Sequence, residues 1–405
     1  MCRDPLPVLF AAATAFGLLC SSVRAADAPP IPPIESATEI GLVKQNAHVL
    51  CRDGLYSALV GRRSVWVFGD TCLDNGGDAG DTFIDNTLAW TTHLDASEGI
   101  RLNKDLADSQ RVPVRFIPYT ANELAVNAER APNEIALWPG QIVNDPKRKR
   151  VLIFYGAVFR GTKIGFHPVG GGIAVSDPAF TNVTRPVESL DPDAKEPTYM
   201  WYGAERQYGA GYVLDGDMLY CYGGDSVGLS THVHVARVPL ADAIDKTRWQ
   251  YWNGTAWAAD DKDSATIYQG GAAGDTIFWS DWLGAYVTVY QRFLDNTVYY
   301  RVADRPEGPW SREAAMFVAR QGDANDPSYA ARVHTEMSEG GGRTIYVTYA
   351  MTTGLLRQSL PIEKVTFGAM PKRSGSGRRP DPEETGTRGR HWAGLASATA
   401  LRKKS

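Results

Sequence analysis

The 405-residue sequence predicts an all-β fold, a single five-bladed β-propeller. Five runs of apolar and aromatic residues recur at intervals of roughly 60–90 residues, a spacing that suits a four-stranded blade with loop insertions. Each run follows a turn and an earlier strand-like segment, and a third such segment follows most of them. Aromatic and β-branched residues favour strands. A β-sandwich is the rival all-β architecture, but it does not explain five matching hairpins in succession.

The expected blades follow one another along the chain. Their second strands are the runs SVWVFGDT, VLIFYGAV, MLYCYGGD, AYVTVYQR and TIYVTYAM. The turns that precede these runs are Gly61-Arg62, NDPK, Asp215-Gly216, Leu283-Gly284 and EGGG. The third strands are NTLAWTTH, GGIAVSD, THVHVARV, NTVYYRVA and LLRQSLP. Outside these strands, the pattern indicates only a short helix near Leu240–Trp249.

The two ends of the chain differ from its body. Residues 1–25 have the basic, apolar and small-residue segments of a signal peptide, and residues 26–39 form a Pro-rich leader. The propeller is expected over residues 40–371, and residues 372–405 read as a disordered basic tail. No later stretch approaches the ~20 apolar residues of a membrane span. We therefore expect a secreted or periplasmic protein without a transmembrane anchor.

Charge is unevenly distributed. The body carries a net charge of −11, since the whole chain is −4, the tail +6 and the first 25 residues +1. An acidic body argues against a nucleic-acid partner. The basic tail suits contact with an anionic surface, although a solvated tail is the simpler interpretation.

The segment CRDGLYSALVGRRSVWVFGDTC reads as a hairpin with facing like residues. If Gly61-Arg62 is its two-residue loop, the numbers of facing residues sum to 123. Cys51 then faces Cys72 at a Cα separation of about 4.5–5.5 Å, which permits a disulfide in an oxidising compartment. Cys221 is left as a small buried thiol.

The same register places Asp53 opposite Asp70, and like charges directly opposed across strands are destabilising. Two carboxylates at close range cannot both ionise easily, so one pKa rises. An acid and a base in one place are what glycoside hydrolysis needs. Asp-Gly and Gly-Asp also occur as plain turn chemistry, so a structural role for both aspartates stays open.

Candidate substrate-binding residues lie where first strands begin or second strands end. Glu134 is a possible third carboxylate, and Trp138 is an aromatic suited to stacking on a sugar ring. The turns also predict two oppositely charged facing pairs, Arg206 with Asp225 and Asp275 with Arg292. In the last blade, the candidates are Tyr329, Arg332 and His334. Arginine and histidine near the axis would bind hydroxyls or a carboxylate; the alternative is that these residues form a structural latch that closes the ring. No metal site and no cofactor are expected, because His232 and His234 lie on a third strand, remote from the axis.

The segments DGLYSALVGRRSVWVFGDT and YAARVHTEMSEGGGRTIYVTYA resemble domain-of-unknown-function family 4185, part of which forms glycoside hydrolase family 183, endo-D-arabinanases acting on mycobacterial arabinan. The resemblance spans about residues 40–367. It implies a five-bladed propeller hydrolase whose catalytic aspartates are Asp53 and Asp70. This sequence departs from the family pattern at Thr335 and in the long acidic insertion GDTCLDNGGDAGD.

Two functional hypotheses follow. The first is a secreted glycoside hydrolase that cleaves a furanoside polysaccharide through a paired-aspartate mechanism. The substrate would be arabinan-like, and the specific activity would be that of an endo-D-arabinanase. The alternative is a non-catalytic propeller that binds carbohydrate or the cell envelope through the same face.

Overall fold

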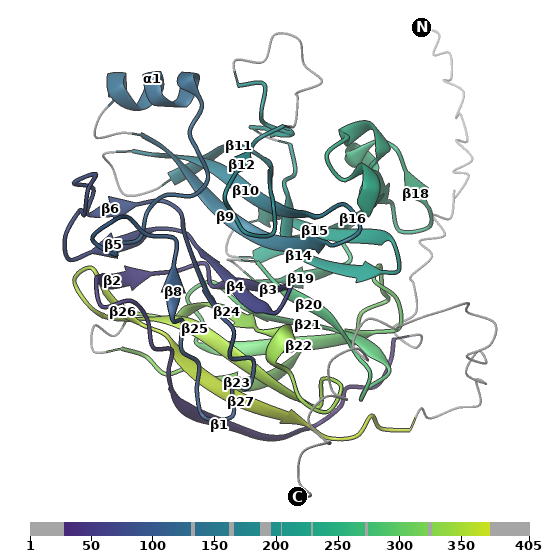
Figure 1. Ribbon diagram of the computed structural model, residues 1–405. Coiled ribbons are helices and arrows are strands. Elements are labelled where there is room, and N and C mark those ends of the chain that lie inside the picture. Colours follow the sequence, from purple (N-terminus) through teal and green to yellow (C-terminus); the bar gives the residue numbers. More distant parts are fainter. Residues whose placement is uncertain are drawn as a thin grey trace, which may run out of the picture.

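The computed structural model describes residues 28–372, except 131–133, 162–165, 187–195, 204, 228–229, 272–273 and 323–325. The expected signal peptide and almost all of the expected basic tail lie outside these residues. Strands are the main regular structure of the described chain (Figure 1), and they form five antiparallel sheets of four to six strands and one three-stranded sheet. None of the helices in the described ranges is long and apolar enough to cross a membrane.

Each of the first four large sheets is built from one stretch of the chain, although the stretch of the first sheet also holds β5 (Thr71–Leu73) and β6 (Phe83–Ile84), which belong to the three-stranded sheet. The first contains β3 (Tyr56–Val60), β4 (Arg63–Phe68), β7 (Thr87–Thr91) and β8 (Lys104–Asp105). The second contains β9 (Glu134–Asp145), β10 (Arg150–Arg160), β11 (Phe166–Ser176), β12 (Val183–Thr184) and β13 (Trp201–Tyr202). The third contains β14 (Tyr208–Asp215), β15 (Met218–Val227), β16 (Ser230–Pro239), β17 (Gln250–Trp252), β18 (Trp257–Ala258) and β19 (Tyr268–Gly270). The fourth contains β20 (Thr276–Ser280), β21 (Ala285–Gln291), β22 (Thr297–Ala303) and β23 (Ala314–Val318).

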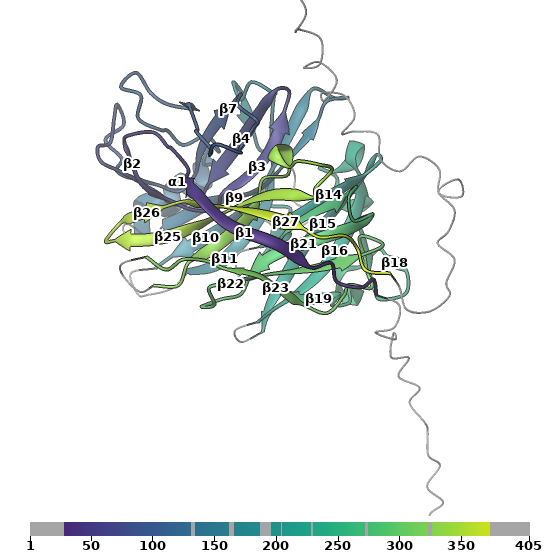
Figure 2. The same cartoon turned by 90° about the horizontal axis from the view of Figure 1, so that it is seen from below.

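The fifth large sheet joins the two ends of the described chain. It contains β24 (Tyr329–Val333), β25 (Thr344–Gly354), β26 (Arg357–Ser359), β27 (Pro361–Phe367) and β1 (Ile34–Leu42). β1 pairs antiparallel with β27, and Figure 2 shows the purple strand lying along the yellow one. Most of β1 comes from residues expected to be a Pro-rich leader. The ladder between β1 and β27 shows that this range is part of the folded unit from Ile34 onward.

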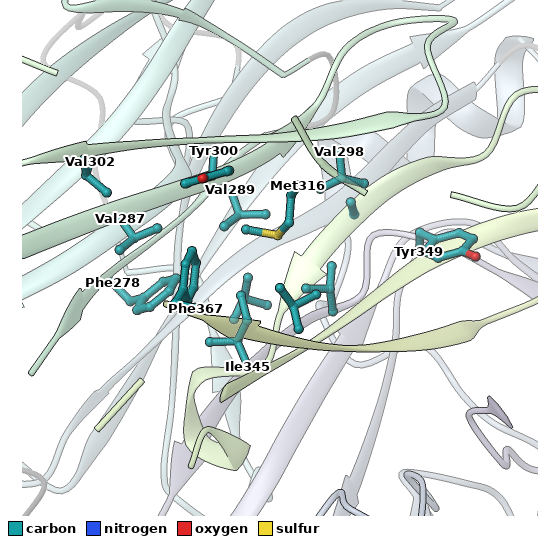
Figure 3. Packing of buried hydrophobic residues seen from close by; sticks show 14 of the residues in the cluster. Phe278, Val287, Val289, Val298, Tyr300, Val302, Met316, Ile345, Tyr349 and Phe367 are labelled. Atoms are coloured by element: carbon teal, nitrogen blue, oxygen red, sulfur yellow. The ribbon is translucent and has the colours of Figure 1, made fainter. Parts of the chain in front are cut away.

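Five hydrophobic clusters lie between pairs of large sheets. They join the first sheet to the second, the second to the third, the third to the fourth, the fourth to the fifth, and the fifth back to the first. In the cluster of Figure 3, Val289 and Met316 of the fourth sheet pack with Ile345 and Phe367 of the fifth. Successive side chains of a strand point to opposite faces, so each large sheet contributes apolar residues to two clusters: in β4, Val65 and Val67 face the second sheet and Trp66 faces the fifth.

Helical content differs from expectation in two places. The segment Leu240–Trp249 holds two short 3₁₀ turns, Leu240–Asp242 and Lys246–Arg248, in place of one helix. A helix that the pattern did not indicate, α1 (Ala121–Arg130), lies at the edge of the molecule (Figure 1). It begins with a reciprocal capping box, in which the Thr120 backbone N–H donates to Glu123 and the Glu123 N–H donates to Thr120. The T-x-x-E pattern is the sequence signal that could have located it.

Candidate active site

The register expected for the first hairpin is confirmed. β3 and β4 are joined by Gly61-Arg62, and Tyr56 pairs with Val67, so the numbers of facing residues sum to 123. The small sheet continues in the same register, since β2 (Val49–Arg52) pairs with β5 (Thr71–Leu73) through Cys51 opposite Cys72. These two cysteines form a disulfide with a Cα–Cα distance of 4.9 Å, and Cys221 is a buried free thiol. Asp53 and Asp70 lie in the gap between the two ladders.

The backbone kinks at this gap. Gly54 and Leu55 both adopt positive φ, 86° and 57°, and Leu55 is fully buried. A left-handed leucine is uncommon, because its Cβ crowds the backbone, and such strain concentrates at functional sites. The Gly69 N–H donates to the Asp53 carbonyl at 2.9 Å, which keeps the two chains together across the break.

The carboxylate of Asp53 is held from the last sheet. The Tyr329 hydroxyl donates to Asp53 Oδ2 at 2.8 Å and accepts a bond from Gln358 Nε2 at 2.7 Å. Burial raises the pKa of Asp53, while the Tyr329 hydrogen bond and the charge of Arg332 act in the opposite direction. Burial dominates because a desolvated carboxylate favours its neutral form.

The carboxylate of Asp70 is held from the second sheet. Trp138 Nε1 and Arg160 Nη1 both donate to Asp70 Oδ1, each at 2.9 Å. Burial raises the pKa of Asp70 to about 7; the charge of Arg160 lowers it and the charge of Asp53 raises it. The other side of the Arg160 guanidinium pairs with Glu134. The two aspartates are therefore close enough to interact, as the register predicts.

A third carboxylate lies behind Asp70. Asp85 is fully buried, and its negative charge adds to the rise in the pKa of Asp70. Its oxygens accept bonds from Arg115 Nε at 2.6 Å, from the Tyr119 hydroxyl at 2.9 Å and from the Leu137 N–H at 2.5 Å. This set fixes Asp85 as an internal acceptor.

Three of the candidates for substrate binding thus surround the aspartate pair: Glu134, Trp138 and Tyr329. Arg332 lies nearby but is almost completely buried, and its guanidinium stacks over the Tyr56 ring at 4.1 Å. Its Nη1 donates to the carbonyls of Gly274 and Ala331. Arg332 therefore acts on Asp53 through its charge, from inside the protein.

His334 takes the role of a latch between the first and last sheets. It is fully buried, its Nδ1 lies 2.7 Å from Ser57 Oγ and its Nε2 lies 2.7 Å from Thr348 Oγ1. Its ring stacks on Trp66 with centroids 3.8 Å apart. Burial lowers the pKa of His334 to about 3, so the ring is neutral. With both nitrogens engaged by the protein, His334 is not placed to bind a hydroxyl or carboxylate of a ligand.

The expected pairing of Asp275 with Arg292 is wrong. The fourth-sheet hairpin closes through four residues, 281–284, and Thr276 pairs with Val289, so the facing numbers sum to 565. Arg292 instead pairs with Glu313 at 2.5 Å. Asp275 accepts bonds from the Tyr268 hydroxyl and the Gly271 N–H, and burial raises its pKa to about 6.

The pairing of Arg206 with Asp225 is correct, although the turn is not Asp215-Gly216. Asp215 pairs with Met218, which makes Gly216-Asp217 the loop, and a bulge between Tyr208 and Gly211 restores the expected register at the other end. Arg206 Nη2 lies 2.7 Å from Asp225 Oδ2, and its Nη1 also reaches Asp261. These residues form an ion-pair network of the third sheet. Within the described part of the chain, no contact links this network to Asp53 or Asp70.

Three residues around the aspartate pair were missed: Asp85, Arg160 and Gln358. Arg160 ends the second strand of the second sheet and pairs in register with Glu134, so the argument that located Asp70 could have found it. Gln358 lies in β26, a strand added after β25, and no periodic signal marks it. Across the described ranges, no group of three or more His, Cys, Asp or Glu side chains is arranged to hold a metal ion.

Solved structures with the same fold include two at a TM-score of 0.50. A protein of Bacteroides ovatus, provisionally described as a hydrolase, is 14% identical over 77% of this chain and 85% of its own. A family 117 glycoside hydrolase of Zobellia galactanivorans is 10% identical over 89% of this chain and 99% of its own. Likeness at these identities concerns the fold.

No curated protein matches the sequence. Residues 49–353, which include both aspartates, the disulfide, the first four large sheets and two strands of the fifth, match the profile of a single family. The chain therefore belongs to the family described as domain of unknown function DUF4185.

Proposed function

We propose that the five large sheets are the blades of one closed five-bladed β-propeller. The support is the cyclic order of the hydrophobic clusters, in which every large sheet packs on two others and the fifth packs on the first. The pairing of β1 with β27 would then close the ring by combining the two ends of the chain in one blade.

We further propose that the protein is a glycoside hydrolase that uses Asp53 and Asp70. The observation that carries this proposal is two opposed carboxyl groups, each with a raised pKa and each held by hydrogen bonds from a different sheet. A pair of this kind supplies an acid and a base near neutral pH, which is the requirement for cleaving a glycosidic bond.

The contacts assign different roles to the two aspartates. Both donors to Asp70 converge on Oδ1, which leaves Oδ2 to carry the proton that the leaving glycosidic oxygen receives as the C–O bond breaks. Asp53, oriented by Tyr329, then acts at the anomeric carbon, as nucleophile or as base for the attacking water. Tyr329 donates to the charged form of Asp53 and so favours the anion needed for that role.

The substrate class that we propose is a furanoside polysaccharide of the arabinan type, with endo-D-arabinanase activity as its specific form. The resemblance of the aspartate motifs to the part of this family that forms glycoside hydrolase family 183 supports this assignment. Export is part of the proposal, and the N-terminal sequence and the Cys51–Cys72 disulfide support it. The basic tail would contact an anionic surface in that location.

The test is hydrolysis of plant and mycobacterial arabinans by the mature protein, with product analysis, alongside Asp53→Asn and Asp70→Asn. We expect each substitution to reduce kcat/KM by at least 10³-fold, because removing one member of a catalytic carboxyl pair removes acid or nucleophilic catalysis. Asp217→Asn, in the loop between β14 and β15, is the matched control and should leave the rate unchanged. Unchanged activity in both site variants would refute the mechanism. Glycan binding that survives both substitutions, with no product from any polysaccharide, would support the non-catalytic alternative.

A further inference from the structure

We propose that Trp138, Phe166 and Phe83 form a binding subsite beside Asp70 for an uncharged sugar ring. The inference rests on the proposed function and deepens it, because it names the part of the surface that would hold the sugar next to the bond being cleaved.

Trp138 is fixed in place by the same bond that holds Asp70. Because its indole N–H donates to Asp70 Oδ1, the plane of the ring is set relative to the carboxyl group. Phe166 packs against this ring edge-to-face, with centroids 4.7 Å apart, and it is 62% exposed. Trp138 and Phe166 therefore present a preorganised aromatic corner that borders Asp70.

Phe83 borders the site on the side of Arg160. The Arg160 guanidinium lies over the Phe83 ring, 4.9 Å from its centroid, and the ring is 43% exposed. Phe83 belongs to β6 (Phe83–Ile84) and pairs in register with Cys72, which the disulfide ties to Cys51. The small sheet thus fixes the backbone that carries Phe83 close to the aspartate pair.

Folding alone does not explain these two phenylalanines. Burying a phenylalanine side chain stabilises a folded protein, and both rings forgo much of this stabilisation because they are partly exposed on the surface. The C–H face of a sugar ring would cover them, while Glu134, which is partly exposed, would accept hydrogen bonds from hydroxyl groups. Ligand sites combine apolar walls with a few placed polar groups in this manner.

The charges around the subsite select an uncharged sugar. Among the described residues, Arg160 is the guanidinium at this surface, and it is already shared by Asp70 and Glu134. With Asp53 as the anion that the proposed mechanism requires, these four side chains carry a net negative charge even when Asp70 holds its proton. The guanidinium of Arg115 forms an ion pair with Asp85. A uronate or sulfate group would therefore meet carboxylates with no cation left to pair with it in the part of the chain that the structure describes, and like charges at close range are repelled.

The test uses the Asp53→Asn protein, which would bind without cleaving, and isothermal titration calorimetry. The probes are arabino-, xylo- and galacto-oligosaccharides as the neutral set and oligogalacturonate as the charged one. We expect one or more neutral oligosaccharides to bind, Phe166→Ala and Phe83→Ala each to raise Kd about tenfold, and oligogalacturonate to bind at least tenfold more weakly. Leu214→Ala, which changes an apolar residue of 37% exposure next to the β14–β15 turn, is the control and should leave Kd unchanged.

The outcomes separate this inference from the proposed function. If the wild type hydrolyses a glycan but both phenylalanine variants bind it normally, the subsite is wrong and the hydrolase stands. If no glycan is cleaved but binding of a neutral oligosaccharide depends on both rings, the subsite stands and the hydrolase fails. Binding of oligogalacturonate as tight as that of every neutral probe, or no binding of any neutral probe, would overturn the subsite. Unchanged melting temperatures in both variants would exclude misfolding as the cause of a lost signal.

Discussion

Tyr329 donates a hydrogen bond of 2.8 Å to Asp53 from 276 residues further along the chain. The bond joins the last large sheet to the first hairpin, and it favours the charged form of a carboxyl group that burial would otherwise keep neutral. The Tyr329 hydroxyl therefore orients the Asp53 carboxyl group and opposes the rise in its pKa that burial causes.

Tyr329→Phe should raise the pKa of Asp53 further, because it removes a bond that stabilises the anion. We expect the acidic limb of the pH profile of kcat/KM to move to higher pH, with a loss of about 10- to 100-fold at neutral pH. The measurement is the pH–rate profile on the best arabinan substrate. Tyr300→Phe, which loses a hydroxyl bonded to Pro32, is the control and should leave the profile in place. A profile of Tyr329→Phe that coincides with the wild type would contradict the role of this bond.

Gly69→Ala should impair catalysis while the protein still folds. A Cβ at Gly69 would lie 2.7 Å from Asp53 Oδ1, and Gly69 does not have a positive φ, so alanine suits the backbone but displaces the carboxyl group. A displacement of about 1 Å at a reacting group can cost on the order of 100-fold in rate. Gly354→Ala, where the nearest neighbour lies at 3.9 Å, is the matched control. Equal kcat values for both variants and the wild type would show that the carboxyl group has room to move.

Asp70→Asn should raise the melting temperature at alkaline pH. The folded-state pKa of Asp70 is about 7 and the unfolded value 3.8, so ionising this group destabilises the folded state as pH rises between these values. A difference of this size corresponds to at most about 4 kcal/mol. We expect the variant to melt a few degrees higher at pH 8 and the two curves to converge below about pH 4. The check is differential scanning calorimetry from pH 4 to pH 8, and a variant less stable than the wild type at pH 8 would contradict it.

The Cys51→Ala/Cys72→Ala protein should be less stable than the oxidised wild type. The disulfide closes a loop with a sequence separation of 21, for which chain entropy contributes about 3 kcal/mol. We expect the melting temperature to fall by roughly 4 °C, because a folded unit of this size has a large entropy of unfolding. In dithiothreitol, the wild type should approach the variant, which serves as the internal control. The protein lacking residues 1–25 contains three cysteines. When it is unfolded in denaturant without reductant, thiol titration should detect only Cys221.

Register was predictable where the turn was located correctly, and it failed where the turn was misplaced or the loop was longer than two residues. Gly61-Arg62 was located correctly, and the positions of both cysteines and both aspartates followed from it. In the fourth sheet, the loop has four residues, and every pairing beyond it shifted, so Arg292 does not face Asp275. In the third sheet, the predicted turn was one residue too early, but a bulge in the observed strand restored the expected facing of Arg206 and Asp225. Neither a loop length nor a bulge has a pattern in single-sequence periodicity, because both depend on how the strands pack.

The sequence by itself determined the β class, the succession of hairpins, the facing cysteines and the opposed aspartates, because alternation and turn chemistry act between residues near one another in the chain. Only the tertiary structure decided which partners hold the aspartates: Arg160 and Trp138 from the second sheet, and Tyr329 with Gln358 from the fifth. It also decided that His334 is buried as a latch and that residues 34–39 belong to a strand. These contacts join segments up to 277 residues apart, and they form when hydrophobic faces of separate sheets pack, a process that local sequence patterns do not encode.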